Sequence, residues 1–268
     1  MAKMRGILLY LRNNALCLSY IMNELLRGFD PITLEQMKGI KLMNRTDTKF
    51  ITTIDRLEEL LLYAQEQYFI QDIDGGRNML YFTRYFDTPD CRMYVMHQNG
   101  KKTRQKVRVR SYVDTGLAFI EVKNKNNHGR TKKKRISIDH KDVEQNEYNE
   151  FLSQHLSYSP KILLPQIENQ FNRITLVNKQ KTERLTIDTQ LRFDNLVTGN
   201  EMNLDRLVII ELKRDGNVYS PIRDIMRDLR IHPQGFSKYC MGMALTNESL
   251  KRNRFKERMM LLEKMRII

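Results

Sequence analysis

Residues 104–125 read RQKVRVRSYVDTGLAFIEVKNK. Two runs in which charged and apolar residues alternate flank Asp114-Thr115-Gly116, and this pattern predicts two strands joined by a three-residue hairpin loop. Alternate residues of a strand share one face, so one face of the hairpin is charged and the other apolar. The charged face carries Lys106, Arg108, Arg110, Glu121, Lys123 and Lys125.

The same alternation recurs along the chain. The further rows are Arg45, Asp47 and Lys49; Lys133 and Arg135; Arg184, Thr186, Asp188 and Arg192; and Glu211 and Lys213. One such row is typical of an ordinary sheet with helices on one face and water on the other. Several rows together favour an α+β fold, in which an antiparallel β-barrel tunnel of about eight strands has a charged interior and helices packed outside.

Hydrophobic periodicity predicts the order of the elements. We expect strands over 44–53, 79–87, 104–113, 117–125, 131–139, 165–177, 183–195 and 206–214. Asp55 and Glu58 predict a capping box at the start of a helix. Further helices are expected over 141–156, 221–229, 237–245 and 250–266. We divide the chain into an N-terminal helical segment (1–28), a core domain (29–248) and a basic C-terminal helix (249–268).

Composition restricts the classes of function. A net charge of +14 indicates contact with phosphate in nucleic acid, nucleotide, polyphosphate or an anionic membrane surface. The 3 cysteines are far apart and form neither a disulfide framework nor a CxxC metal motif, which favours a reducing, cytoplasmic compartment. No apolar run is long enough to predict a transmembrane helix.

Seven short motifs occur in one order along the chain. They are Arg45-Thr-Asp-Thr-Lys-Phe50, Lys106-Val-Arg-Val-Arg110, Ile120-Glu-Val-Lys123, Asn172-Arg173, Arg184-Leu-Thr-Ile-Asp188, Ile210-Glu-Leu-Lys213 and Ser237-Lys-Tyr239. From about Phe29 to Thr246 the chain resembles the VTC domain, the polyphosphate polymerase branch of the triphosphate tunnel metalloenzymes. The family fold, a β-barrel tunnel with basic walls, agrees with the fold expected from the alternation.

The resemblance implies roles for particular residues. The residues that match the family's basic tunnel walls are Arg108, Arg110, Lys123, Arg173 and Arg184, which we expect to be catalytic, and Lys49, Lys133 and Lys238, which we expect to bind substrate. Glu211 matches the glutamate that binds Mn²⁺ or Mg²⁺. The run Lys132-Lys-Lys-Arg135 permits a slip of one residue at Lys133. Glu121 and Asp188 could be further metal ligands or salt-bridge partners of the basic residues, and we favour the second role.

The expected function is a metal-dependent polyphosphate polymerase that transfers the γ-phosphate of ATP to a growing polyphosphate chain. Its partners would be ATP and inorganic polyphosphate, with no specific nucleic acid. The first strand reads Arg45-x-Asp47-x-Lys49 where the related CYTH-like triphosphatases have ExExK, and this favours the polymerase branch. Two alternatives stay open: a tripolyphosphatase or nucleoside triphosphatase of the same fold, and a non-catalytic polyanion binder.

Overall fold

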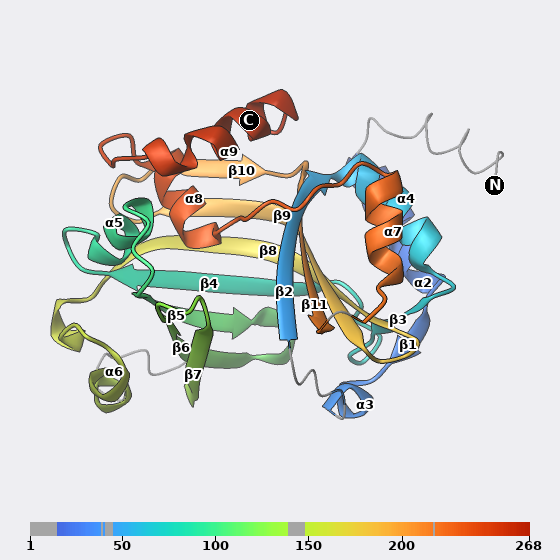
Figure 1. Ribbon diagram of the computed structural model, residues 1–268, viewed down its shortest axis with the longest axis horizontal. Coiled ribbons are helices and arrows are strands. Elements are labelled where there is room, and N and C mark those ends of the chain that lie inside the picture. Colours follow the sequence, from blue (N-terminus) through green and yellow to red (C-terminus); the bar gives the residue numbers. More distant parts are fainter. Residues whose placement is uncertain (1–14, 39, 41–44, 139–147, 217) are drawn as a thin grey trace. The chain divides into compact units, whose positions relative to one another are not determined.

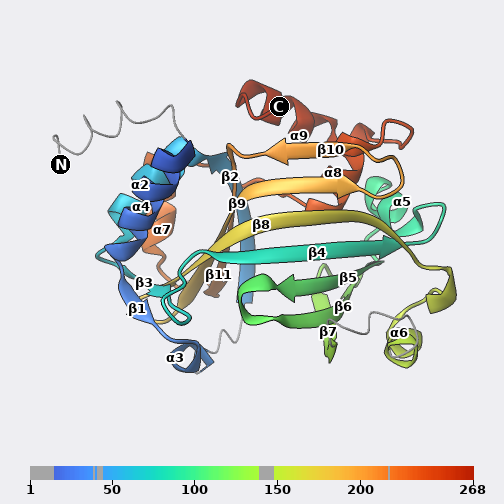
Figure 2. The same cartoon turned by 180° about the vertical axis from the view of Figure 1, so that it is seen from behind.

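The computed structural model describes residues 15–38, 40, 45–138, 148–216 and 218–268 (Figures 1 and 2). Its helices are α2 (Ala15–Arg27), α3 (Leu34–Lys38), α4 (Ile54–Ala64), α5 (Arg92–Gln98), α6 (Asn149–His155), α7 (Pro221–Asp228), α8 (Lys238–Thr246) and α9 (Lys256–Lys264). Its strands are β1 (Asp30–Ile32), β2 (Arg45–Thr53), β3 (Tyr68–Gln71), β4 (Met79–Asp87), β5 (Arg104–Tyr112), β6 (Leu117–Lys125), β7 (Thr131–Ile138), β8 (Leu164–Asn178), β9 (Glu183–Asn195), β10 (Glu201–Leu204) and β11 (Leu207–Asp215).

The chain divides into two compact units. Unit 1 takes in the residues up to Asn78, Ile174–Ile187 and Val208–Gly235. Unit 2 takes in Met79–Arg173, Asp188–Leu207 and the residues from Phe236 onward. The long strands β8 and β9 contribute to the sheets of both units.

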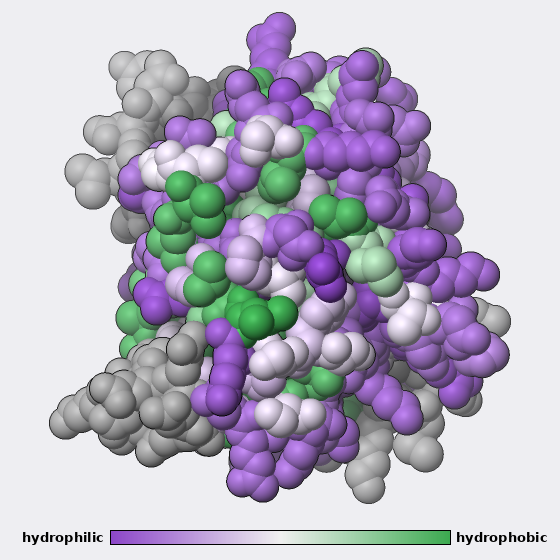
Figure 3. Space-filling view, turned by 90° about the vertical axis from the view of Figure 1, so that its left-hand side faces the viewer, coloured by the Kyte–Doolittle hydropathy of each residue, from purple (hydrophilic) through white to green (hydrophobic). Residues whose placement is uncertain are grey.

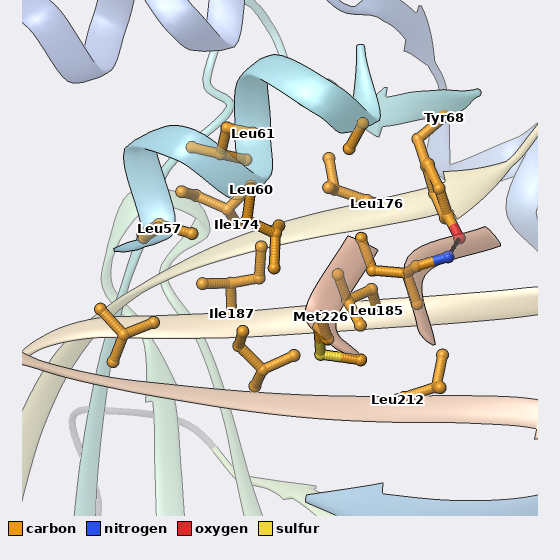
Figure 4. Close-up of a cluster of buried hydrophobic side chains, with 14 of the residues drawn as sticks. Leu57, Leu60, Leu61, Tyr68, Ile174, Leu176, Leu185, Ile187, Leu212 and Met226 are labelled. Carbon is orange, nitrogen blue, oxygen red and sulfur yellow. Dashed lines mark hydrogen bonds between the residues drawn. The ribbon is translucent and has the colours of Figure 1, made fainter. Parts of the chain in front are cut away.

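In unit 1 the strand order is β2-β11-β9-β8, with β3 also paired to β8 and β1 paired parallel to β3. Helix α4 carries Leu57, Leu60 and Leu61 on one stripe, as the 3.6-residue period requires, and all three are fully buried (Figure 4). They pack on apolar strand residues such as Ile174 and Leu185. Full burial of one such side chain is worth about 1.5–3 kcal/mol, so this stripe holds the helix on the sheet.

The start of α4 differs from the sequence-based expectation. The helix begins at Ile54, and the N-cap Thr53 makes no side-chain cap hydrogen bond. The capping box predicted for Asp55 and Glu58 is therefore wrong. Glu58 is only 5% exposed, because it lies among the buried residues of the helix.

In unit 2 the strand order is β9-β8-β4-β5-β6-β7, with β10 paired to β9. The predicted hairpin is confirmed: β5 and β6 pair antiparallel from Arg104↔Lys125 to Tyr112↔Leu117. The loop is one residue longer than predicted, because Val113 leaves the strand and begins a short 3-10 turn, Val113–Thr115. Gly116, with a φ of +67°, closes the loop in the left-handed region that glycine adopts without strain. The apolar face of the hairpin, which includes Val107 and Ile120, packs on residues of α6.

The antiparallel sheet and the helices packed around it confirm the predicted fold class. The structure describes 11 strands, where the sequence predicted about eight. The three strands that were not predicted are the short strands β1, β3 and β10. Helix α5 was not predicted either. The order ends at β2 and β7, and within the described ranges no pairing joins these two strands into a closed barrel. Part of the helix expected over 141–156 lies outside the described residues, as do residues 1–14 of the N-terminal segment; α6 begins at Asn149.

One charged row is shorter than predicted. Gln190, in the middle of β9, has a φ of +52°, a left-handed conformation that interrupts the alternation of the strand. Beyond it, Phe193 lies beside Gly242 of α8, the helix whose Lys238 binds Asp188. Arg192 instead pairs with Asp194 and Glu201 at the surface. The prediction that Arg192 shares the face of Asp188 is therefore wrong.

Hydrophilic residues dominate the molecular face shown in Figure 3, with smaller hydrophobic groups between them. The partly exposed apolar side chains of unit 2 include Val95 at 37% and Ile162 at 43%. In the part of the chain that the structure describes, no helix combines the length and apolar character needed to cross a membrane.

Candidate phosphate-binding site

Unit 2 gathers basic side chains on the face of β5, β6 and β7 that lies opposite the apolar contact with α6. Strand register aligns them, because Lys106 pairs with Lys123 and Lys123 with Lys133. Arg108 pairs with Glu121 on the same face. We call this surface the cationic face; it comprises Lys106, Arg108, Arg110, Glu121, Lys123 and Lys133.

Glu121 ties two of these cations together. Its Oε2 accepts a hydrogen bond from Arg108 Nε at 2.7 Å, and its Oε1 accepts one from Lys133 Nζ at 2.9 Å. Burial raises the pKa of the Glu121 carboxyl, but the charges of Arg108, Arg110 and Lys133 outweigh burial and hold the pKa far below its ordinary value. The register and this contact identify Lys133, rather than its neighbours, as the lysine on the cationic face.

A second carboxylate, Asp188, anchors another pair of cations. Arg173 donates to it in bidentate fashion, from Nε at 2.6 Å and from Nη2 at 2.8 Å, and Lys238 of α8 also donates to it. Burial raises the pKa of Asp188, whereas Arg173 and Lys238 lower it further, so that the pKa lies well below the ordinary value. Burial lowers the pKa of Lys238 to about 8, even though Asp188 opposes this. Lys238 Nζ also lies 4.1 Å from the centre of the Phe171 ring.

Arg110 is different from its neighbours. It is only 8% exposed, yet in the described chain it forms no ion pair with a carboxylate within hydrogen-bonding reach; its Nε donates to Thr83 Oγ1 at 3.4 Å. Its guanidinium lies over the rings of Tyr81 and Phe171, at 5.6 and 5.7 Å. Burial, followed by the charges of Arg108 and Arg173, lowers the pKa of Arg110 to about 10. An anion bound here would offset the cost of burying the Arg110 guanidinium and its repulsion by Arg108 and Arg173.

Aromatic residues that the sequence analysis did not single out support these cations. Tyr85 accepts a hydrogen bond from Arg108 Nη1 at 3.4 Å and stacks on Tyr239. Burial raises the pKa of the Tyr85 hydroxyl, but the charges of Arg108 and Arg110 outweigh burial and lower it to about 8. The alternation of Tyr81, Thr83 and Tyr85 is a signal in the sequence, but β4 has aromatic residues on both faces, which hides it.

The other candidate residues lie in unit 1. Glu211 on β11 forms ion pairs with two lysines. Its Oε1 lies 2.5 Å from Lys213 Nζ, and its Oε2 lies 3.6 Å from Lys49 Nζ. Arg184 lies on β9 in the same unit. The part of the chain covered by the structure contains no group of three or more His, Cys, Asp or Glu side chains arranged to hold a metal ion. Glu211 therefore offers one carboxylate in basic surroundings.

The buried carboxylates Glu121 and Asp188 form the salt bridges that we favoured for them. Because the folded pKa of Asp188 is depressed, its contribution to stability is present above the unfolded value of about 3.9 and is lost as pH falls. We expect Asp188→Asn to lower the free energy of unfolding at pH 7 by about 3 kcal/mol, since it leaves Arg173 and Lys238 without a counter-charge.

Chemical denaturation at pH 7 and pH 3 measures both effects. The variant should also lose less stability than the wild type on acidification, because it lacks the carboxylate that must be protonated. Asp194→Asn is the matched control, since Asp194 pairs with Arg192 at the surface and its replacement should change stability by less than about 0.5 kcal/mol. Equal acid sensitivity of the wild type and Asp188→Asn would contradict the assignment.

Most of the chain matches one protein family. Residues 44–247 match the model of the VTC domain. No curated protein matches the chain.

Several solved structures are similar to it. A putative adenylate cyclase from Bacillus halodurans is 14% identical, with 73% of this chain and 96% of that chain covered and a TM-score of 0.49. The PH1819 protein of Pyrococcus horikoshii OT3 is 13% identical over 74% of this chain and 97% of that chain, with a TM-score of 0.42. The putative adenylyl cyclase HpAC1 from Hippeastrum, described as having a dominant triphosphatase activity, is 11% identical over 76% and 97%, with a TM-score of 0.47.

Proposed function

Because this chain belongs to the VTC domain family, whose model covers residues 44–247, we propose that it is a polyphosphate polymerase. The reaction would transfer the γ-phosphate of ATP to the end of a growing polyphosphate chain. The O–P bond between the β- and γ-phosphates breaks, ADP leaves, and a new O–P bond forms to the terminal oxygen of the chain.

The proposal is carried by the buried position of Arg110 near Arg108 and Arg173, where no carboxylate of the described residues forms a salt bridge with it. Their carboxylates, Glu121 and Asp188, hold these two neighbours in place. A phosphate group would supply the negative charge that Arg110 lacks, with the charge-assisted geometry that guanidinium groups favour. The site is thus organised before the substrate arrives.

The reaction requires little proton chemistry from the protein. The end of a polyphosphate chain is already an anionic oxygen nucleophile, so no general base is needed. Catalysis by phosphoryl-transfer enzymes rests on positioning and on stabilising charge over the transferred group. We assign these roles in unit 2 to Arg108, Arg110, Lys123 and Arg173, with Lys133 and Lys238 binding phosphates. Arg184 and Lys49 of unit 1 have the corresponding roles that the family resemblance implies.

Glu211 is the residue that we propose for a divalent metal ion, Mn²⁺ or Mg²⁺. Such ions commonly bind through one or two carboxylates together with substrate phosphates. A single carboxylate flanked by Lys49 and Lys213 fits this arrangement, because the phosphates would provide the remaining oxygen ligands and charge. When bound, the metal would neutralise negative charge on the phosphates.

Incubating purified protein with ATP and Mn²⁺ or Mg²⁺, and separating the products on a polyphosphate gel, tests the proposal. We expect ladders of long chains together with ADP, and neither in EDTA. Release of inorganic phosphate without chains would instead support the triphosphatase alternative. If duplex DNA competed with ATP and no product formed, the chain would be a polyanion binder.

A further inference from the structure

The cationic face continues beyond the residues assigned to the reaction. Arg104 and Lys125 are cross-strand partners at the start of β5 and the end of β6. They lie two residues beyond the Lys106–Lys123 pair, so the alternation of both strands places them on the same face. Each step of two residues advances about 6.8 Å along a strand. The row therefore extends the cationic face away from Arg108 and Arg110.

Arg104 is held in place by its own contacts. Its Nη1 donates to the carbonyl of Lys101 at 2.8 Å, and its Nη2 lies 3.5 Å from His97 Nε2. A guanidinium can only donate, so His97 Nε2 accepts, and the proton on Nδ1 points to the Cys240 sulfur at 3.0 Å. Burial and the charges of Lys106, Arg104, Arg254 and Lys125 lower the pKa of His97 to about 2, which keeps the ring neutral.

A third cation, Arg254, joins this row from the C-terminal part of the chain. Its guanidinium lies over Gly100, where an added Cβ would come within 2.7 Å of Nη1. Gly100 has a φ of +72°, so the absence of a side chain serves both the turn and the close approach of Arg254. Burial lowers the pKa of Lys125, and repulsion from Arg104, Lys106 and Arg254 lowers it further.

These three cations share one electrostatic feature. In the described parts of the chain, none of them forms an ion pair with a carboxylate, in contrast to Arg108 and Arg173. Like charges held together without a counter-ion disfavour the folded state, and a bound anion would relieve this. Because the row continues a phosphate-binding face, the anion that fits it is a further phosphate of the same linear ligand.

We propose that Arg104, Lys125 and Arg254 form an additional phosphate subsite that binds polyphosphate chains longer than triphosphate. The inference rests on the proposed function, since it extends the same cationic face. It adds a chain-length preference: tripolyphosphate fills the face around Arg108 and Arg110, and a longer chain also reaches Lys125 and Arg254.

Calorimetric binding of tripolyphosphate and of long-chain polyphosphate to the full chain tests this inference without requiring turnover. We expect Lys125→Ala and Arg254→Ala each to weaken long-chain binding by about fivefold, the effect of about 1 kcal/mol for one ion pair at a surface. Tripolyphosphate affinity should stay within about twofold. The slope of log affinity against log salt for the long chain should fall by about one for each cation removed.

Lys134→Ala is the matched control. Lys134 is an exposed lysine of β7 on the opposite face, since it pairs with Val122. It should alter neither affinity. Unchanged long-chain binding in both test variants, or an equal loss for both ligands, would overturn the subsite. If the protein made no chains from ATP but the variants still weakened long-chain binding selectively, the polymerase proposal would be wrong. The subsite would then be part of a polyanion-binding face.

Discussion

Replacing Arg110 by alanine is expected to lower the rate of polyphosphate synthesis by about a hundredfold to a thousandfold, the usual cost of removing one preorganised donor from a charge-stabilising site. Arg110 is buried, and within the described residues it forms no salt bridge with a carboxylate. Its removal relieves repulsion with Arg108 and Arg173, so the free energy of unfolding should stay the same or rise slightly. Rate measurements with ATP and Mn²⁺, together with urea unfolding, give both quantities.

Two further variants make this result specific. Arg192→Ala removes an exposed arginine of β9 that pairs with Asp194 and Glu201, and it should leave the rate unchanged. Arg108→Ala should reduce the rate and also destabilise the protein by about 3 kcal/mol, since it takes one of two cations from the buried Glu121. Near-normal turnover of Arg110→Ala would exclude the cationic face as the site of phosphoryl transfer.

Replacing Glu211 by glutamine should abolish most activity, because glutamine keeps the size of the side chain and removes the charge that would hold the metal. ATP binding should survive in part, since the basic residues of unit 2 are untouched. Mn²⁺ affinity, measured by electron paramagnetic resonance in the presence of a non-hydrolysable ATP analogue, should fall by about tenfold or more, the effect of about 1.4 kcal/mol.

The metal measurement separates this role from a structural one. Glu211 also contacts Lys49 and Lys213, so its replacement could lower stability without any effect on metal. If the variant lost thermal stability but bound Mn²⁺ like the wild type, Glu211 would have only the structural role of pairing with these lysines. Lys213→Met is the matched control: it removes the contact at 2.5 Å yet leaves the carboxylate available for Mn²⁺.

The sequence by itself determined the local features of this protein. Alternation in 104–125 predicted the β5–β6 hairpin and the face on which Arg108 and Arg110 lie. The spacing of Leu57, Leu60 and Leu61 follows the helical period and puts all three in the buried stripe of α4. These features follow from the periods of strands and helices, which are properties of neighbouring residues.

Only the tertiary structure decided how the charges are partnered. Arg108 and Arg110 are two residues apart in one motif, yet the first forms a salt bridge with Glu121 and the second forms none with any carboxylate of the described residues. Arg173 and Lys238 lie far apart in sequence and meet on Asp188. The left-handed conformation of Gln190, which turns Arg192 away from this face, has no signature in the alternation. Contacts between distant residues and local departures from strand geometry depend on packing, and periodicity does not encode them.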